Sequence, residues 1–81
     1  MGRLPRERPQ KLTAKLLKIR KRLDMSQTQM SKALNVKVHY AAISQFEAGT
    51  REPSLIVLLR YARLARVSME TLVDDKLKLP W

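Results

Sequence analysis

Apolar residues recur along this chain at the spacing of α-helices. In residues 11–23 they occupy positions i, i+4, i+7 and i+11, namely Leu12, Leu16, Ile19 and Leu23. Such a stripe predicts an amphipathic helix that packs one face against a core. The basic side chains of the same segment are expected on the other sides of the helix, and these are Lys15, Lys18, Lys21 and Arg22.

Residues 26–53 predict two short helices joined by a turn. Ser26 and Gln29 have the spacing of a capping box, in which each side chain bonds to the backbone N–H of the other residue. The first helix has an apolar face formed by Met30, Ala33 and Leu34. Asn35 is expected to end it, because asparagine tolerates the left-handed backbone conformation common at helix ends.

The second helix of this pair is predicted at about residues 39–48. Its inner face is formed by Val38, Ala42, Ile43 and Phe46. The outward face carries almost no charge and consists of Tyr40, Ala41, Ser44 and Gln45. Gly49 is expected to end the helix, and Pro53 prevents a simple continuation. Either Val36 or Val38 could plug the core beside the turn, so the helix start is fixed only to within about two residues.

Two further helices and a short tail complete the pattern. Ser54 is expected to cap a helix whose inner face is Leu55, Leu58, Leu59, Ala62 and Ala65. Its arginines are expected to point outward, and they are Arg60, Arg63 and Arg66. Ser68 is expected to cap a short helix over residues 69–73, with Glu70 in its first turn. The tail at residues 76–81 alternates apolar and polar residues, and either folds back on the bundle or pairs with a second copy through Trp81.

The first ten residues form a separate basic segment. They contain two prolines, three arginines and no helical periodicity, which predicts a flexible arm. Arg3, Arg6 and Arg8 are either contacts to DNA phosphates or the minor groove, or residues of a solvated tail. We therefore divide the chain into an arm at residues 1–10, a helical domain at 11–75 and the tail.

Composition indicates a small nucleic-acid-binding domain. The chain has 81 residues, a net charge of +10 and a pI near 10.8, which is the electrostatic pattern of a nucleic-acid binder. It has no cysteine and one histidine, His39, so we expect no metal site and no cofactor. No phosphate-binding glycine loop, activated nucleophile or carboxylate cluster indicates an enzyme. No apolar run is long enough to span a membrane, and the helical stripe of residues 11–23 is needed for the core rather than for lipid. The protein is expected in the cytoplasm, associated with the nucleoid.

A set of residues between positions 20 and 72 resembles the Cro/phage-repressor type of helix-turn-helix, and the likeness covers roughly residues 12–74. The matching residues are Arg20, Met25, Ser26, Gln27, Val38, Ile43, Ser44, Glu47, Gly49, Arg51, Pro53, Val67, Ser68 and Leu72. The resemblance implies a compact all-α bundle of about five helices, of which the third reads the DNA major groove. The chain departs from the family between Leu34 and Val38, where the turn is two residues longer than usual.

The resemblance also implies roles for individual residues. Arg20 is expected to form an internal ion pair with Glu47 and thus to be structural. Contacts with DNA phosphates are expected from Gln27, His39 and Arg51. Base edges are expected to meet the outward face of the third helix, at Tyr40, Ala41, Ser44 and Gln45. Asp24 stands where family members often have glycine, and is expected to form a turn rather than to bind.

These observations predict a sequence-specific regulator of transcription that binds double-stranded DNA, most simply a repressor from a bacterium or phage. It is expected to bind a palindromic operator as a homodimer, because one short helix reads only a few base pairs. One alternative is the DNA-binding antitoxin of a toxin–antitoxin pair, which has a protein partner. Another is a binder of nucleic acid, including RNA, without sequence preference, although the uncharged outward face of the third helix disfavours it.

Overall fold

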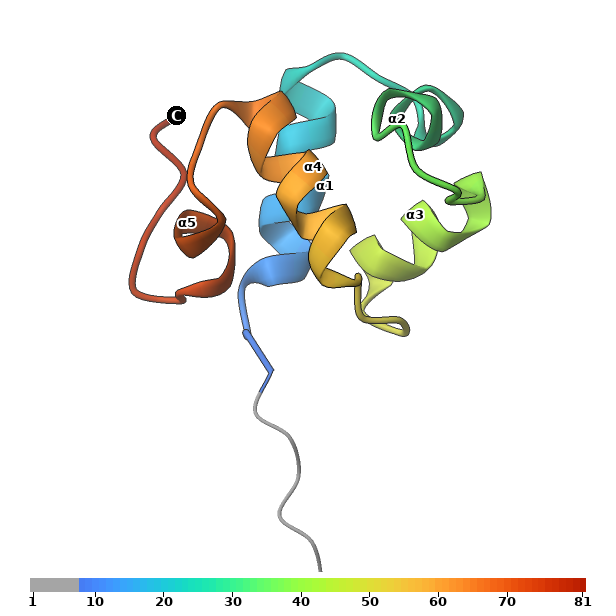
Figure 1. Ribbon diagram of the computed structural model, residues 1–81. Coiled ribbons are helices and arrows are strands. Elements are labelled where there is room, and N and C mark those ends of the chain that lie inside the picture. The colour runs from blue at the N-terminus through green and yellow to red at the C-terminus, as the bar shows by residue number, and fades with distance from the viewer. Residues whose placement is uncertain (1–7) are drawn as a thin grey trace, which may run out of the picture.

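Five helices make up the structure, a computed structural model that describes residues 8–81 (Figure 1). They are α1 (Leu12–Arg22), α2 (Gln27–Ala33), α3 (Tyr40–Ala48), α4 (Leu55–Ala65) and α5 (Met69–Val73). No strand occurs within residues 8–81, and the prediction of an all-α five-helix bundle is confirmed. The arm residues Arg3 and Arg6 lie outside the described residues.

Side-chain caps start four of the five helices. Ser26 and Gln29 form the predicted capping box at the start of α2, and Ser54 and Ser68 cap α4 and α5. His39, the first residue of the predicted recognition helix, caps α3, a capping role that the sequence did not single out. Each cap accepts a hydrogen bond from a backbone N–H that the helix leaves unpaired.

Left-handed residues end several helices. Gly49 has φ 81° at the end of α3, and Asn35 has φ 53° after α2, as predicted for both. Asp24, in the turn after α1, has φ 56°. Arg66 ends α4 at φ 58°, although no glycine or asparagine indicated a left-handed residue there. These reversals direct consecutive helices back across one core.

The core lies where α1 meets α3, α4 and α5. Its fully buried side chains come from all five helices or from their ends: Leu16, Ile19, Met30, Leu34, Ile43, Tyr61 and Leu72. The predicted stripe of α1 is buried at Leu12, Leu16 and Ile19 and partly buried at Leu23. The hydrophobic positions of α1, α2 and α3 are therefore the ones that the sequence pattern indicated.

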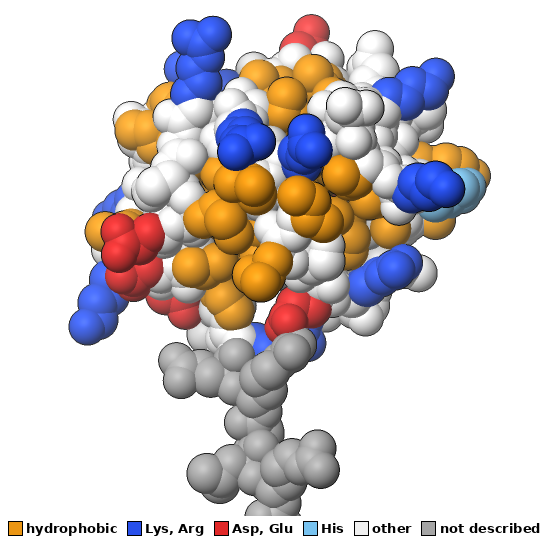
Figure 2. All heavy atoms as spheres, viewed as in Figure 1, with side chains coloured by type: hydrophobic (Ala, Val, Ile, Leu, Met, Phe, Trp, Pro, Cys, Tyr) orange, Lys and Arg blue, Asp and Glu red, His pale blue; other side chains and the backbone are white. Residues whose placement is uncertain are grey.

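The predicted inner face of α4 was wrong at Leu55 and only partly right at Leu59, which is half-buried. Leu55 is 77% exposed, whereas Val57 and Tyr61, which the prediction left out, are buried. The helix is rotated so that Val57, Leu58, Tyr61 and Ala62 face α1 and the core. Figure 2 shows hydrophobic side chains gathered on the face of the molecule where α4 lies. Burial of a full tyrosine ring outweighs the exposure of one leucine.

The arginines of α4 only partly match their predicted outward orientation. Arg63 and Arg66 are exposed, but Arg60 is half-buried. The Nε atom of Arg60 is fully buried and has no hydrogen-bond acceptor among the described residues. A long guanidinium side chain can lie along apolar surface in this way while its end stays in water.

Lys15 also contradicts its predicted exposure. Its side chain is buried, with 6% of the residue accessible. The ammonium Nζ donates to the carbonyl oxygens of Thr71 at 2.7 Å and Asp74 at 3.0 Å. These carbonyls lie at the C-terminal end of α5, where the helix dipole favours a positive charge. Lys15 therefore joins α1 to α5.

The C-terminal tail folds back on its own bundle, which is one of the two arrangements that the sequence allowed. Leu79 and Trp81 pack against the core. The Trp81 ring lies 4.5 Å from Cζ of Arg22 and 6.0 Å from Nζ of Lys18, so both cations of α1 contact its face. The tail thus follows α1 towards its last turn.

The carboxylate of Asp75 bonds to the backbone just before α1. We expect this contact to be lost in acid. The carboxylate accepts from the backbone N–H of Gln10 at 2.8 Å and of Lys11 at 2.9 Å. These two bonds lower the pKa of Asp75. Because the folded pKa is the lower one, the stabilisation is present above the ordinary aspartate pKa and is lost as pH falls through the lowered value. We expect wild type to lose more stability than Asp75→Asn between about pH 7 and about pH 3 in urea denaturation. Equal losses in the two proteins would contradict this assignment.

Candidate nucleic-acid interface

Helix α3 presents an uncharged polar face to solvent. Ala42, Ile43 and Phe46 are buried against the core. The opposite side is exposed, as predicted, at Tyr40, Ala41, Ser44 and Gln45. The hydroxyl and amide groups of this face can bond to base edges, and Ala41 leaves room for a base to approach. A surface that binds only phosphates would instead need cations.

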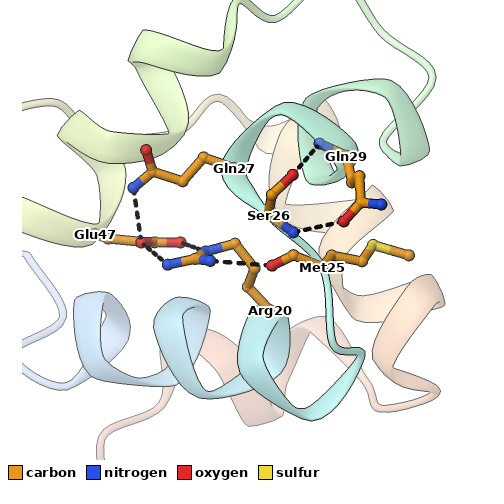
Figure 3. Close-up of polar contacts among 6 residues, drawn as sticks. All are labelled: Arg20, Met25, Ser26, Gln27, Gln29 and Glu47. Carbon is orange, nitrogen blue, oxygen red and sulfur yellow. Dashed lines mark hydrogen bonds and ion pairs between the residues drawn. The ribbon is translucent and has the colours of Figure 1, made fainter.

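An ion pair holds the end of α3 against α1 and α2. Nε of Arg20 lies 2.7 Å from Oε2 of Glu47, and Nη2 donates to Oε1 at 3.0 Å (Figure 3). Nη1 donates to the carbonyl of Met25 at 3.0 Å. The two side chains are only 16% and 8% exposed, and the bond to Glu47 raises the pKa of Arg20. The predicted internal pair is therefore present, with a two-pronged geometry that restricts how α3 can tilt.

Tyr61 lies beneath this ion pair as part of the core. Its ring is completely buried, and its hydroxyl has no hydrogen-bond partner among residues 8–81. Desolvation raises the pKa of Tyr61 above its usual value, with the charge of Glu47 adding to the effect. The phenol therefore stays neutral and packs as an aromatic side chain.

Gln27, predicted to touch a phosphate, is bonded inside the protein as well. Its Nε2 donates to Oε1 of Glu47 at 3.3 Å, while the amide oxygen points away from Glu47 (Figure 3). An amide nitrogen has two hydrogens, so one remains for an outside acceptor. The backbone N–H groups at the start of α2 also favour an anion. The phosphate contact stays a prediction.

The structure shows where α3 begins after the lengthened turn. Both Val36 and Val38 are half-buried and pack against the core, so they share the position for which the sequence offered two candidates. Nδ1 of His39 accepts from the N–H of Ala41 at 3.1 Å. The helix consequently begins at Tyr40, within the predicted range. The ring of His39 also lies 4.3 Å from that of Tyr40, at an angle of 35°.

Two arginines flank the loop between α3 and α4: Arg51, predicted to contact a phosphate, and Arg8, which the sequence left as either an arm contact or part of a solvated tail. Arg51 is exposed, with its Cζ 6.0 Å from the ring of Phe46. Arg8 pairs with Glu52 at 3.1 Å, which fixes the beginning of the described chain beside this loop. An open groove beside the loop is lined by Lys37, His39, Arg51 and Glu52 together with apolar residues of α3 and α4. The cations Lys37 and Arg51 therefore lie beside α3, with one carboxylate in the same groove.

We also searched the described residues for a metal-binding cluster and for a membrane-spanning helix. Among the described residues, His, Asp and Glu side chains form no group of three that could hold a metal ion. The helices within residues 8–81 are too short or too polar to cross a membrane.

Comparison with known proteins identifies the family. A family model described as helix-turn-helix matches residues 16–72. The crystal structure of the P22 c2 repressor protein in complex with synthetic operator 9T in the presence of Tl⁺ is similar, with a TM-score of 0.70. The two sequences are 26% identical, and the match covers 79% of this chain and 94% of that one. The chain matches none of the curated proteins. It belongs to the Cro/C1-type helix-turn-helix family, a family of DNA-binding regulators.

Proposed function

We propose that this protein is a transcriptional repressor that binds a specific double-stranded DNA operator through the outward face of α3. The observation that carries the proposal is the exposed, uncharged set of Tyr40, Ala41, Ser44 and Gln45, on a helix fixed by the Arg20–Glu47 pair. The net charge of +10 supplies attraction to DNA of any sequence. The similar P22 c2 repressor was solved with an operator, and we propose cytoplasmic DNA as the partner here.

The proposed contacts divide by chemistry. Gln45 reads adenine, because its amide can donate to N7 and accept from N6 at once. Tyr40 and Ala41 lie against neighbouring base edges, and Ala41 is small enough to admit a thymine methyl group. Gln27, His39 and Arg51 bind phosphates at the edges of the groove. Two copies reading a palindrome give the operator its length.

Two alanine substitutions test this division. Gln45→Ala should cost about 1–3 kcal/mol on the preferred operator and little on random DNA, with the salt dependence unchanged. Arg51→Ala should weaken binding to every sequence and reduce the salt slope by about one. The operator is first selected from a random DNA library, and both variants are then titrated against operator and scrambled DNA at several salt concentrations.

Controls for this titration come from exposed residues away from α3. Gln10→Ala removes the same amide as Gln45→Ala, and Lys76→Ala removes a surface cation as Arg51→Ala does. Both control residues are exposed. Both control variants should bind the operator nearly as wild type does. If Gln45→Ala loses equal affinity on operator and scrambled DNA, α3 does not read sequence through this residue.

His39 combines two roles that different substitutions separate. Because Nδ1 accepts from the N–H of Ala41, the neutral ring carries its proton on Nε2 and can donate it to a phosphate. His39→Ala should lose both roles, and should lower the free energy of unfolding by about 1 kcal/mol. His39→Ser should keep the cap and lose only the phosphate contact. We expect both variants to bind all DNA more weakly than wild type with an unchanged salt slope, since a neutral donor releases no counterion. Equal stability of the two variants would show that the cap contributes nothing.

A further inference from the structure

An open groove runs between α1 and the C-terminal tail. Its volume is about 270 Å³, with α1 on one side and the tail on the other. We call it the α1–tail groove. Sites that enclose a small molecule usually have volumes of about 300–1,000 Å³. The α1–tail groove is smaller and open, so it is suited to contact with one part of a larger molecule.

Three lysines border the α1–tail groove. They are Lys11 and Lys18 of α1 and Lys78 of the tail, and all three are exposed. Within residues 8–81 none of their ammonium groups forms an ion pair. The two acids that precede the tail, Asp74 and Asp75, accept hydrogen bonds from backbone N–H groups instead. The groove therefore presents positive charge that the described part of the protein leaves uncompensated.

The floor of the α1–tail groove is apolar. Ala14 lies between the two lysines of α1, and Leu77 and Leu79 come from the tail. Leu79 packs against the core and is half-buried, whereas Leu77 is 37% exposed. An apolar floor with a cationic border can hold a partner that brings both an apolar side chain and carboxylates.

These cations face away from α3. Arg20 points toward the end of α3, where it pairs with Glu47. At about 100° per residue, Lys11 and Lys18 lie roughly 160–180° around α1 from Arg20. Figure 1 shows α3 and the tail on opposite sides of the molecule, with α1 and α4 between them. DNA bound to α3 therefore does not reach the lysines of the α1–tail groove.

We propose that the α1–tail groove binds an acidic peptide segment of another protein. An apolar side chain of the peptide covers Ala14, Leu77 and Leu79, and its carboxylates lie beside the three lysines. A nucleic-acid backbone offers phosphates but no apolar side chain for the floor. A lipid surface takes up apolar side chains that protrude from a protein, whereas these line a groove. The proposal goes beyond operator binding, and it is tested without DNA.

The first test selects peptides from a random library displayed on phage, with the full chain immobilised. The enriched peptides should carry aspartate or glutamate on both sides of a leucine or an aromatic residue. One selected peptide is then labelled, and its dissociation constant is measured by fluorescence anisotropy. Enriched peptides without acidic residues would overturn the proposal.

Charge reversals locate the bound peptide. Lys11→Glu and Lys78→Glu should each weaken binding of the selected peptide by about fivefold or more, because each places like charges together. Lys32→Glu makes the same change at an exposed lysine of α2, and should weaken binding by less than about twofold. Thermal melts check that the three variants fold. Equal losses in all three would show that only net charge attracts the peptide, and would overturn the proposal.

A leucine substitution tests the apolar floor. Leu77→Ser should weaken binding of the selected peptide by about fivefold or more, because the apolar side chain of the peptide loses its neighbour. Leu55→Ser makes the same change at a leucine of α4 that is 77% exposed, and should leave the dissociation constant unchanged. Full affinity for Leu77→Ser would overturn the groove as the binding site.

A last measurement distinguishes a peptide from a second nucleic acid. A scrambled DNA duplex is added to the chain with its operator already bound. Binding of this second duplex by wild type, and its loss in Lys11→Glu, would assign the α1–tail groove to nucleic acid and overturn the proposal. Failure of peptide binding leaves the base reading by Gln45 measurable on operator DNA, so the two proposals fail separately.

Discussion

Loss of either partner of the Arg20–Glu47 ion pair is expected to lower the free energy of unfolding by roughly 3–5 kcal/mol. Arg20→Ala leaves the carboxylate of Glu47 at the end of α3 without its guanidinium, and Glu47→Ala leaves a largely buried guanidinium with the Met25 carbonyl alone. Each single substitution therefore keeps the desolvation cost of one charge and removes its compensation.

The double substitution should cost much less than the sum of the two singles, because no orphaned charge remains. Urea denaturation of the two single variants and of the double variant gives the coupling free energy directly. Lys21→Ala, at an exposed residue of the same helix, serves as a control for loss of a surface cation. Additive losses would mean that the two side chains act independently, despite the 2.7 Å separation of Nε and Oε2.

Lys15→Met is expected to lower the free energy of unfolding by about 1–3 kcal/mol. Methionine keeps most of the buried stem but cannot donate, so the carbonyls of Thr71 and Asp74 lose their partner. The positive charge at the end of α5 is lost as well. Lys21→Met makes the same chemical change at an exposed position of α1 and should change the free energy by less than about 0.5 kcal/mol. Equal effects in thermal melts would show that the bonds of Lys15 contribute no net stability.

Local signals predicted much of this fold correctly. The capping box at Ser26, the cap at Ser68 and the left-handed end at Gly49 depend on residues within a few positions of each other. The sequence therefore contains all of the information that they need. The Arg20–Glu47 pair spans 27 residues, and it was predicted only because the chain resembles a known family.

Features that depend on packing between distant helices were not predictable in this way. Almost every position in the first part of α4 is apolar, so periodicity did not distinguish the exposed Leu55 from the buried Val57 and Tyr61. Contacts with α1 and α5 choose the buried face instead. Lys15 resembled a surface lysine because its acceptors are backbone carbonyls about 56 residues away. Backbone acceptors leave no mark in the sequence.

The candidate interface shows the same division. The exposed face of α3 was predicted correctly, because the helical spacing of the buried side chains determines which residues lie on the opposite side. The cap formed by His39 was not predicted, because histidine is not among the preferred capping residues. The sequence also could not show that Val36 and Val38 both pack against the core, because either valine alone satisfies the apolar pattern of the turn.

The bonds from Lys15 and Asp75 between the two ends of the fold also affect how the domain forms during translation. A ribosome completes α1, α2 and α3 before it adds the residues that pair with Lys15 and with the beginning of α1. At about 5–20 residues per second, the stretch from Gly49 to Asp75 takes roughly 1–5 s to synthesise. During that interval the nascent helices expose apolar surface that α4 and α5 later cover. We therefore expect chains that end before α4 to bind chaperones more readily than the finished domain does.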